Sequence, residues 1–351
     1  MRQYKSLRIF KGRLSFLIDK RATRTFWVML IVTVAVFILS IGLGEMNLTP
    51  LTVLKVLFGG GNDMDKLVVF SFRLPRIIVA LLVGISLAVS GGILQGMIRN
   101  PLASPDILGI TGGAAVAVVS FLAMFSDSNH ALTVSIKWLP LAAFIGAAVV
   151  SLLVYLLAWK NGVTPIRLVL IGIGLSMLMQ ALTTLFMILG PIYQASQANI
   201  WITGTVNSAS WENIGMLLPW TCILILMTFA MMRKINIQEL GDEIATGVGS
   251  NIGRGRFFLL MISTALIGGA VAFAGGIGFV GLMAPHMARR LVGSSYGALL
   301  PVSALIGGIL VMIADLVGRT LFSPLEIPAG VFTSGIGAPY FIYLLFKTRN
   351  A

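Results

Sequence analysis

Nine apolar stretches, most of them about long enough to cross a lipid bilayer, constrain this 351-residue chain more than any other feature. A helix needs about 20 predominantly apolar residues to span the hydrocarbon core. Backbone amides cannot stay unpaired in lipid, so such stretches predict helices. The sequence therefore predicts an all-α polytopic membrane protein. The stretches are Phe26–Leu43, Ile77–Ile98, Ile107–Phe125, Trp138–Trp159, Leu168–Leu189, Ile214–Met232, Phe257–Met283, Ala298–Val317 and Val331–Phe346.

The composition agrees with this class, because only 11% of the residues are charged, against about 25% in soluble domains. Residues 1–25 carry eight basic side chains and one acid. This basic lead predicts a cytoplasmic N-terminal tail, followed by one membrane domain over residues 26–351. The net charge of +13 is assigned to topology and anionic lipid, not to nucleic acid. The single cysteine, Cys222, excludes an intrachain disulfide.

Two segments of the chain resemble each other at a constant offset of 184 residues. Gly84, Ala88, Gly91, Gly92, Ile93, Pro101, Gly109, Gly113 and Ala114 fall on Gly268, Ala272, Gly275, Gly276, Ile277, Pro285, Gly293, Gly297 and Ala298. A duplicated membrane segment with matching Gly and Pro breaks is typical of transporters. Chance similarity between Gly-rich helices is the alternative.

The repeat predicts ten spans, five in each half, with the halves (about 26–200 and 201–351) inverted relative to each other. In this interpretation Phe257–Met283 is one long helix that breaks at Pro285, and residues 286–296 make a short crossing. Both termini then lie in the cytoplasm, as the basic residues at each end favour. A hairpin at Gly275-Gly276 is the alternative, and it would place Arg289 and Arg290 in the cytoplasm.

No enzymatic constellation is visible in the sequence. No phosphate-binding loop with its lysine occurs, so the chain is not expected to hydrolyse ATP, and no Ser-His-Asp arrangement can be argued. His130 and His286 lack ligand-spaced neighbours, so no metal site is expected. The sequence thus predicts neither catalytic residues nor a cofactor of its own.

Buried ionisable residues are costly in membranes, so four of them are candidates for function: Asp106, His286, Arg290 and Asp315. Asp106 follows Ser104-Pro105 and is expected to cap a helix. Asp315 lies four residues before Arg319, which predicts a local pair. The loop 233–256 predicts a short helix over Gln238–Val248, which either docks into a partner's groove or is a solvated connector.

Several motifs resemble the FecCD family, whose permeases import ferric siderophores, haem and cobalamin. The matching segments cover the chain from about residue 70 onward. They are RLPR at 73–76, GISLAVSGGILQGMIRNPLASPDILGITGGA at 84–114, WITGT at 201–205, LGDEIATGVGSN at 240–251, GGIGFVGLMAPHMARRLVG at 275–293, ADLVGR at 314–319 and EIPAGVFTSGIGAPYFIYLL at 326–345.

The resemblance implies a ten-helix subunit of a type II ATP-binding-cassette importer in the bacterial plasma membrane. Its partners would be two ATPase subunits that hold ATP and Mg²⁺, an extracytoplasmic binding protein, and a second, identical or related permease. The segments Leu168–Leu189 and Val331–Phe346 would line the pathway.

The resemblance also implies three groups of site residues. Arg73, Arg76 and Arg319 match positions that dock acidic lobes of the binding protein, although contact with lipid phosphate is the alternative. Leu240, Gly241, Asp242, Glu243, Ala245 and Gly249 match the coupling helix that meets the ATPase. Asn100, Pro101 and Leu102 match the inner gate, together with Thr164 in the loop 161–166.

Ferric siderophore import is the function that the resemblance favours, with haem or cobalamin import by the same fold as the alternative. An ion-coupled secondary transporter is the alternative from a different class. The residues show no chain of carboxylates that could relay protons, which weighs against it. A membrane-embedded enzyme is disfavoured by the missing catalytic constellation.

Overall fold

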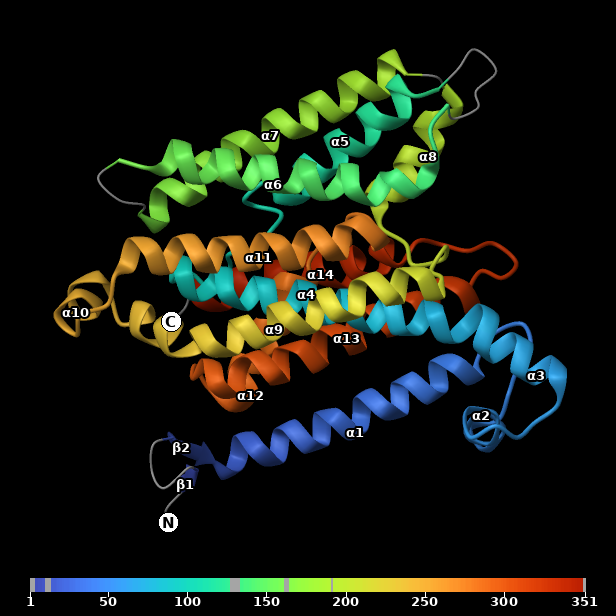
Figure 1. The fold of residues 1–351 in the computed structure, drawn as a ribbon, viewed down its shortest axis with the longest axis horizontal. Coiled ribbons are helices and arrows are strands. Elements are labelled where there is room, and N and C mark those ends of the chain that lie inside the picture. The colour runs from blue at the N-terminus through green and yellow to red at the C-terminus, as the bar shows by residue number, and fades with distance from the viewer. Residues whose placement is uncertain (1–3, 10–13, 127–132, 161–163, 191, 350–351) are drawn as a thin grey trace.

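The computed structural model describes residues 4–9, 14–126, 133–160, 164–190 and 192–349, and it forms an elongated helical bundle (Figure 1). Eight described helices are long and apolar enough to cross a membrane. In chain order, the first five are α1 (Lys20–Gly42), α4 (Leu74–Ile98), α6 (Leu139–Ala158), α7 (Pro165–Leu189) and α9 (Trp211–Glu239). The others are α11 (Ile252–Ala274), α13 (Tyr296–Thr320) and α14 (Ala329–Arg349).

Two shorter helices complete the crossings, α5 (Ile110–Met124) and α12 (Val280–Val292). Eight long and two short helices agree with the predicted ten spans, five on each side of α8 (Ile192–Thr203). The all-α membrane fold predicted from the apolar stretches is confirmed. The division of the chain at about residue 200 stays a prediction.

The two ends of the bundle differ in what covers them. At one end, called the α2 end, lie α2 (Pro50–Leu57) and α3 (Asp63–Leu67). The opposite end, called the α10 end, carries α10 (Asp242–Gly247). Both chain termini lie toward the α10 end (Figure 1).

The N-terminal tail contains a β-hairpin that the sequence did not predict. Strands β1 (Tyr4–Ile9) and β2 (Leu14–Asp19) pair antiparallel, with Tyr4 opposite Asp19. Asp19 then caps α1, because its carboxylate accepts from the Arg21 amide at 2.8 Å. The first helix therefore begins at Lys20, six residues earlier than the apolar stretch.

Close helix crossings in the core depend on small residues. Gly84 of α4 meets Gly307 of α13 so tightly that a Cβ on Gly84 would lie 2.2 Å from the Gly307 carbonyl oxygen. Gly268 of α11 packs in the same manner against Phe144 and Ala147 of α6. Small residues allow such approaches in membrane bundles. The repeat-related helices α4 and α11 thus each pack against a helix of the opposite half.

The predicted long helix over Phe257–Met283 is wrong. Helix α11 ends at Ala274, because Gly275 adopts a left-handed conformation (φ 66°) and the chain turns back into α12. Pro285 lies inside α12 and breaks nothing. The hairpin alternative at Gly275-Gly276 describes the chain correctly, and the short crossing is α12 itself.

The repeat keeps its register in sequence but not in structure. Gly91 and Gly92, the mates of Gly275 and Gly276, lie within the uninterrupted helix α4. There Gly91 lets the backbone of Gly281 approach, and a Cβ would lie 1.8 Å from the Gly281 oxygen. The same residue pair thus serves a helix contact in one half and a turn in the other.

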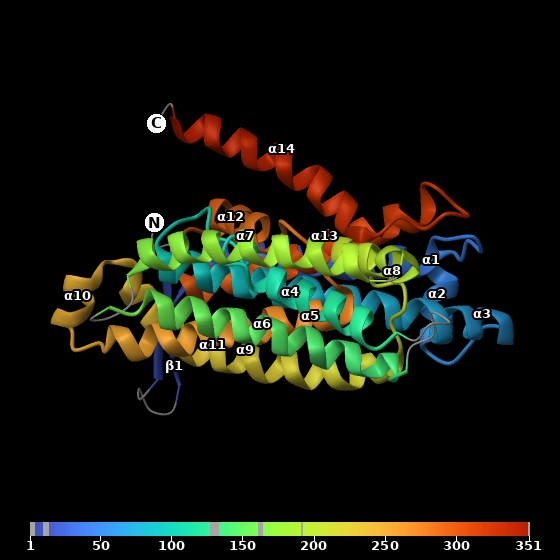
Figure 2. The same ribbon diagram turned by 90° about the horizontal axis from the view of Figure 1, so that it is seen from above.

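Helix α14 leaves the bundle at an angle, so that its C-terminal end stands clear of the other helices (Figure 2). Its first turn is held against the end of α8, where the Gly330 amide donates to the Gly204 carbonyl at 3.0 Å. Apolar side chains such as Ile336 and Phe346 are exposed along it. Further along, the Tyr340 ring meets His286 of α12, so the described chain covers only part of this helix.

Candidate functional site

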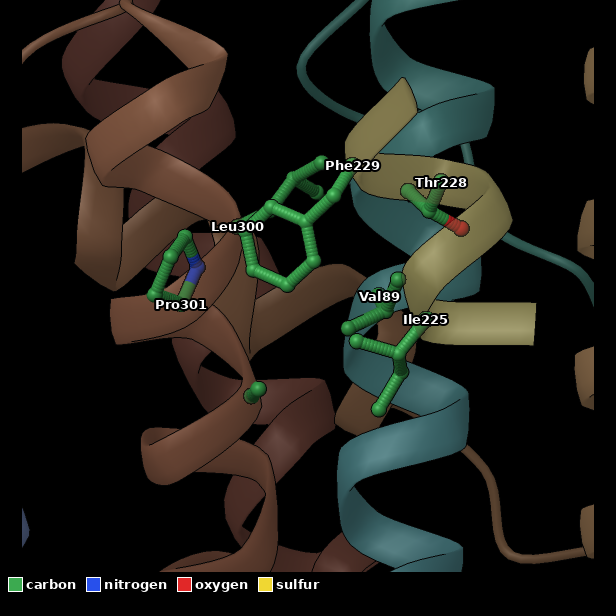
Figure 3. A pocket seen from close by; sticks show the side chains of 7 residues that line it. Val89, Ile225, Thr228, Phe229, Leu300 and Pro301 are labelled. Atoms are coloured by element: carbon green, nitrogen blue, oxygen red, sulfur yellow. The ribbon is translucent and has the colours of Figure 1, made fainter. Parts of the chain in front are cut away.

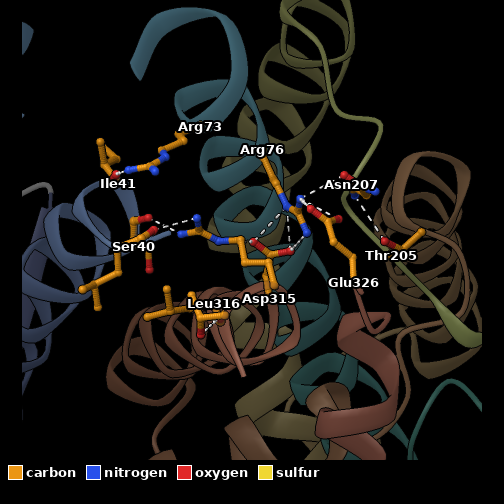
Figure 4. Close-up of polar contacts among 12 residues, drawn as sticks. Ser40, Ile41, Arg73, Arg76, Thr205, Asn207, Asp315, Leu316 and Glu326 are labelled. Carbon is orange, nitrogen blue, oxygen red and sulfur yellow. Dashed lines mark hydrogen bonds and ion pairs between the residues drawn. The ribbon is translucent and has the colours of Figure 1, made fainter. Parts of the chain in front are cut away.

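The α2 end holds a buried ion cluster around Arg76 (Figure 4). Asp315 is 3% exposed, and both of its oxygens accept from Arg76 Nε, at 2.9 and 3.1 Å. Arg76 Nη1 donates to Glu326 Oε2 at 3.0 Å and to Asn207 Oδ1 at 2.9 Å. The guanidinium therefore connects α4, α13 and the loops that border α8 and α14.

Arg73 and Arg319 both bind backbone carbonyls at the C-terminal end of α1, and Figure 4 shows Arg73 beside Ile41. Arg73 donates to the carbonyls of Ile41, Gly42 and Met46, at 2.7, 3.1 and 2.6 Å. Arg319 donates to the carbonyls of Leu43, at 2.8 Å, and Ser40. Cations satisfy the free carbonyls at a helix C-terminus. The predicted pair of Asp315 with Arg319 is confirmed at 3.7 Å, but Arg76 is the closer partner.

The three arginines predicted to dock a partner thus all have partners within the chain. They still line a cavity of about 330 Å³ at the α2 end, whose wall includes Glu45 and Glu326. Asn207 and Glu326 were not predicted as site residues. Glu326 opens the EIPAG segment, yet no spacing in the sequence pairs it with an arginine 250 residues away.

At the α10 end, ion pairs anchor the short helix α10 to the rest of the bundle. Asp242 of α10 pairs with Arg99 at 3.1 Å and with Arg256 at 2.7 Å, which ties α10 to the ends of α4 and α11. Gly241 has a φ of 112°, a conformation that suits glycine. The helix covers Asp242–Gly247, a shorter segment than the predicted Gln238–Val248, because α9 continues to Glu239.

An apolar stripe runs along the outer side of this segment. Leu240, Ile244 and Val248 are 64%, 54% and 65% exposed. Ile244 lies in α10, Leu240 precedes it across the non-helical Gly241, and Val248 follows its last residue, while Ala245 is buried. Glu243 and Gly249, also predicted to couple, are exposed. An exposed apolar surface on a short helix that ion pairs hold in place is suited to a groove in another protein.

The predicted inner-gate residues lie at the same end. Asn100 follows α4, and its side chain accepts from the Leu102 amide at 2.9 Å, so a tight turn runs through Pro101. Thr164 precedes α7 and is exposed. Residues 161–163 of that loop lie outside the described residues. The gate role stays a prediction.

The two short helices begin at the centre of the bundle, near each other. Gly109 and Phe279, the residues that precede α5 and α12, both have left-handed backbones. Asp106 accepts from the Thr111 hydroxyl at 3.0 Å and interacts with the Phe279 amide. The expectation that Asp106 caps the helix that follows it is wrong in detail, since Gly109 takes the N-cap position of α5. Its carboxylate instead connects both helix starts.

The remaining candidates form no site. His286 contacts Tyr340 edge-on, with ring centroids 5.9 Å apart, and His130 lies outside the described residues. Arg290 is exposed at the end of α12, and its neighbour Arg289 pairs with Glu239 at 2.8 Å. Within the described ranges, no group of three metal-ligating residues occurs. Cys222 is exposed and free.

A small cavity between α4, α9 and α13 is almost entirely apolar (Figure 3). It measures about 50 Å³ and is lined by Val89, Ile225, Thr228, Phe229, Leu300, Pro301 and Ala304. The Thr228 hydroxyl already donates to the Leu224 carbonyl, which leaves only its oxygen to accept. One hydroxyl oxygen in a cavity of this size cannot hold a bulky chelate.

The structure thus combines a membrane bundle with two short helices that begin near each other and a short exposed helix at one end. Residues 31–347 match the FecCD transport family. The chain belongs to this family. As a FecCD permease it is 61% identical to the "Probable siderophore transport system permease protein YfhA" of Bacillus subtilis (strain 168), over 95% of this chain and 97% of that protein.

Other relatives agree with this assignment. The FecCD permease described here is 46% identical to the iron(3+)-hydroxamate import permease FhuG of Bacillus subtilis (strain 168), over 90% of this chain and 94% of that one. A solved inward-facing structure assigned to the metal-chelate type of ABC transporter superposes with a TM-score of 0.82 at 29% identity. It covers 93% of this chain and 99% of its own. The ten-crossing architecture is therefore that of an ABC transporter membrane subunit.

Proposed function

We propose that this FecCD permease is the membrane-spanning subunit of an ATP-binding-cassette importer that moves ferric siderophore complexes into the cytoplasm. The observation that carries the proposal is near full-length similarity to relatives named as siderophore and iron-hydroxamate permeases. The chain itself supplies the passage, and separate subunits supply energy and substrate.

Two ATPase subunits, which hold ATP and Mg²⁺, dock at the α10 end. The support is the apolar stripe of Leu240, Ile244 and Val248, which lie in and on either side of a short helix that Asp242 fixes to the bundle. Gly241 allows the sharp entry into α10, and Gly249 closes it with a φ of 78°. Buried Ala245 and exposed Glu243 complete the coupling surface.

An extracytoplasmic binding protein docks at the α2 end. The support is the cavity of about 330 Å³ that Arg73, Arg76 and Arg319 line. An acidic lobe entering this cavity would meet guanidinium groups whose geometry suits carboxylates. Because Arg73 and Arg319 also hold α1, docking there would act on the end of the first helix.

A second permease subunit, identical or related, covers the faces that α7 and α14 leave exposed. Leu170, Met177 and Ile336 are 64%, 66% and 58% exposed, and the remaining apolar surface faces membrane lipid. The pathway runs between the two subunits. The turn of Asn100, Pro101 and Leu102, with Thr164 before α7, forms its inner gate.

The α10 end lies in the cytoplasm, and with it both termini, in a bacterial plasma membrane. The hairpin at Gly275-Gly276 brings Arg289 and Arg290 to this end, because Arg289 pairs with Glu239 of α9. Arg99, Arg167, Arg254 and Arg256 already flank it. An excess of basic residues marks the cytoplasmic side of membrane proteins.

Uptake of radiolabelled iron, supplied as a panel of ferric siderophores to a strain lacking this chain and to the complemented strain, tests the proposal. The expected result is loss of uptake of one or more siderophores and its rescue. Uptake of haem or cobalamin alone would assign the chain to those substrates. Rescue without any ATPase copurifying with the chain would point to an ion-coupled transporter.

A further inference from the structure

A polar cavity lies halfway along the bundle, among α5, α7, α8 and the turn between α11 and α12. It measures about 250 Å³. Its lining combines hydroxyl, amide and carboxyl groups with apolar side chains, in contrast to the apolar cavity of Figure 3. The polar members are Asp106, Thr111, Ser176, Gln180 and Thr183, and Trp201 is the largest apolar one.

Asp106 is the only charged residue in this lining. Its carboxylate is held by the Thr111 hydroxyl at 3.0 Å and by the Phe279 amide. The N-termini of α5 and α12, with their partial positive charge, flank it. Neither lysine nor arginine lines the cavity, so Asp106 carries the only full charge that a solute would meet there.

Two residues of α7 leave hydrogen-bonding capacity free. In the part of the chain that the structure describes, the Gln180 side-chain amide has no hydrogen-bond partner, and the residue is exposed. The Thr183 hydroxyl donates to the Met179 carbonyl at 2.8 Å, which leaves its oxygen free to accept. The cavity therefore offers donors and acceptors for a ligand.

We propose that this cavity is a contact site on the import pathway for ferric chelates without net negative charge, namely hydroxamates, held by Gln180 and Thr183. The inference rests on the proposed function and deepens it. Each hydroxamate group carries one negative charge, so three of them balance Fe³⁺. Each catecholate group carries two, so a ferric tris-catecholate is an anion. An anion in this cavity would face Asp106 with no lysine or arginine beside it.

Equilibrium dialysis tests the site directly, without the selectivity of a binding protein. The purified permease in lipid nanodiscs is dialysed against two radiolabelled ferric chelates, a neutral trihydroxamate and an anionic tris-catecholate. We expect the wild type to bind the trihydroxamate at least about tenfold more tightly. Gln180→Leu should weaken trihydroxamate binding by roughly fivefold or more, since it removes the side-chain amide that would hydrogen-bond to the chelate.

Gln180→Lys supplies the missing cation and is the sharper variant. It should narrow the preference for the trihydroxamate by about tenfold, because the ammonium group attracts the tris-catecholate. Thr184→Val is the matched control on the same helix, since Thr184 is exposed and outside the cavity lining. It should bind both chelates as the wild type does.

Equal binding of the two chelates by the wild type, or unchanged binding by both Gln180 variants, overturns the inference. The proposed function fails separately, if deletion of the chain leaves siderophore uptake intact. Normal siderophore uptake by cells carrying either Gln180 variant, with unaltered chelate binding, removes the contact site and leaves the importer standing.

Discussion

Arg76 holds two carboxylates of very different exposure. Asp315 is 3% exposed and Glu326 is 40% exposed. The inner carboxylate is a permanent partner, because its charge would otherwise be buried and unpaired. The outer one, Glu326, lies at the wall of the cavity, where solvent reaches it.

The buried ion pair of Arg76 with Asp315 should contribute strongly to the free energy of unfolding. Asp315→Ala leaves Arg76 and Arg319 without their buried counterion, and breaking such a pair costs about 3–5 kcal/mol. We expect a clearly lower thermal unfolding midpoint for the detergent-purified protein. Glu212→Ala is the control, because the Lys137–Glu212 pair is 77% and 69% exposed. It should change stability by less than about 1 kcal/mol. Equal midpoints for both variants would contradict this role for Asp315.

The outer pair yields a test of docking. If a binding-protein carboxylate uses Arg76, it competes with Glu326, so Glu326→Gln should raise the affinity for the loaded binding protein by about fivefold, or ~1 kcal/mol. Wild-type affinity should fall as salt is raised. Titrations of purified transporter at two salt concentrations measure both effects. Indifference to salt and to Glu326→Gln would leave Arg73 and Arg319 to hold α1 and Arg76 to hold Asp315, with no role in docking.

At the scale of elements, α10 and the glycine crossings have separate tasks. Helix α10 is short and largely exposed, and ion pairs fix it to two long helices. The crossing of α4 with α13 is buried and depends on the absence of side chains at Gly84 and Gly307. Changes to α10 should therefore affect coupling, and changes to the crossing should affect folding.

Ile244→Asp places a charge in the middle of the apolar stripe on α10. We expect it to abolish copurification of the ATPase subunits while the permease keeps its thermal midpoint, because Ile244 is 54% exposed and makes little of the core. Glu212→Gln, a polar change at an exposed residue at the opposite end of the bundle, is the control. Gly241→Pro should also uncouple, since proline cannot adopt the φ of 112°. If the ATPase still binds Ile244→Asp at wild-type affinity, α10 is only a connector.

Gly84→Ala tests the crossing. The new Cβ would lie 2.2 Å from a backbone oxygen of α13, which cannot move aside as a side chain could. Overpacking of this kind costs about 1–3 kcal/mol or more. Gly174→Ala is the control, because no atom lies within 4 Å of a Cβ at that helical site. It should be neutral or stabilise by up to about 1 kcal/mol. Equal unfolding midpoints for the two variants would mean that α4 and α13 separate freely.

The apolar stretches predicted these elements well, because burial in lipid demands length and hydropathy from any helix. Helix α4 begins three residues before its predicted start, and α7 likewise. The turn at Gly275 was misplaced, since a Gly-Gly pair is equally suited to a close crossing and to a left-handed turn. The spacing of the repeat predicted that a helix ends at Pro285, but that proline lies inside α12. The partners of Arg73, Arg76 and Arg319 are mainly distant backbone carbonyls and carboxylates, which no local pattern reveals.

At the scale of the whole molecule, the hairpin between α11 and α12 fixes the topology. Cys222 is exposed and would be replaced first. A cysteine at Ser295 should then be labelled from the same side of the membrane as one at Glu243, and a cysteine at Ser323 from the opposite side. Impermeant maleimide applied to intact cells and to inverted vesicles measures this. Labelling of positions 295 and 323 from one side would contradict the ten-crossing arrangement.

Helix α1 packs mainly against α13, a helix that lies late in the sequence. Its end is held by Arg319, which donates to the Leu43 carbonyl across 276 residues of sequence. Ribosomes add about 5–20 residues per second, so on the order of tens of seconds pass between synthesis of the first helix and of its partner on α13. During that interval α1 lies in the membrane without α13 beside it. Although α1 is synthesised first, it is therefore among the last helices to reach its final packing. A nascent chain arrested before α13 should keep α1 exposed to the membrane's quality-control proteases.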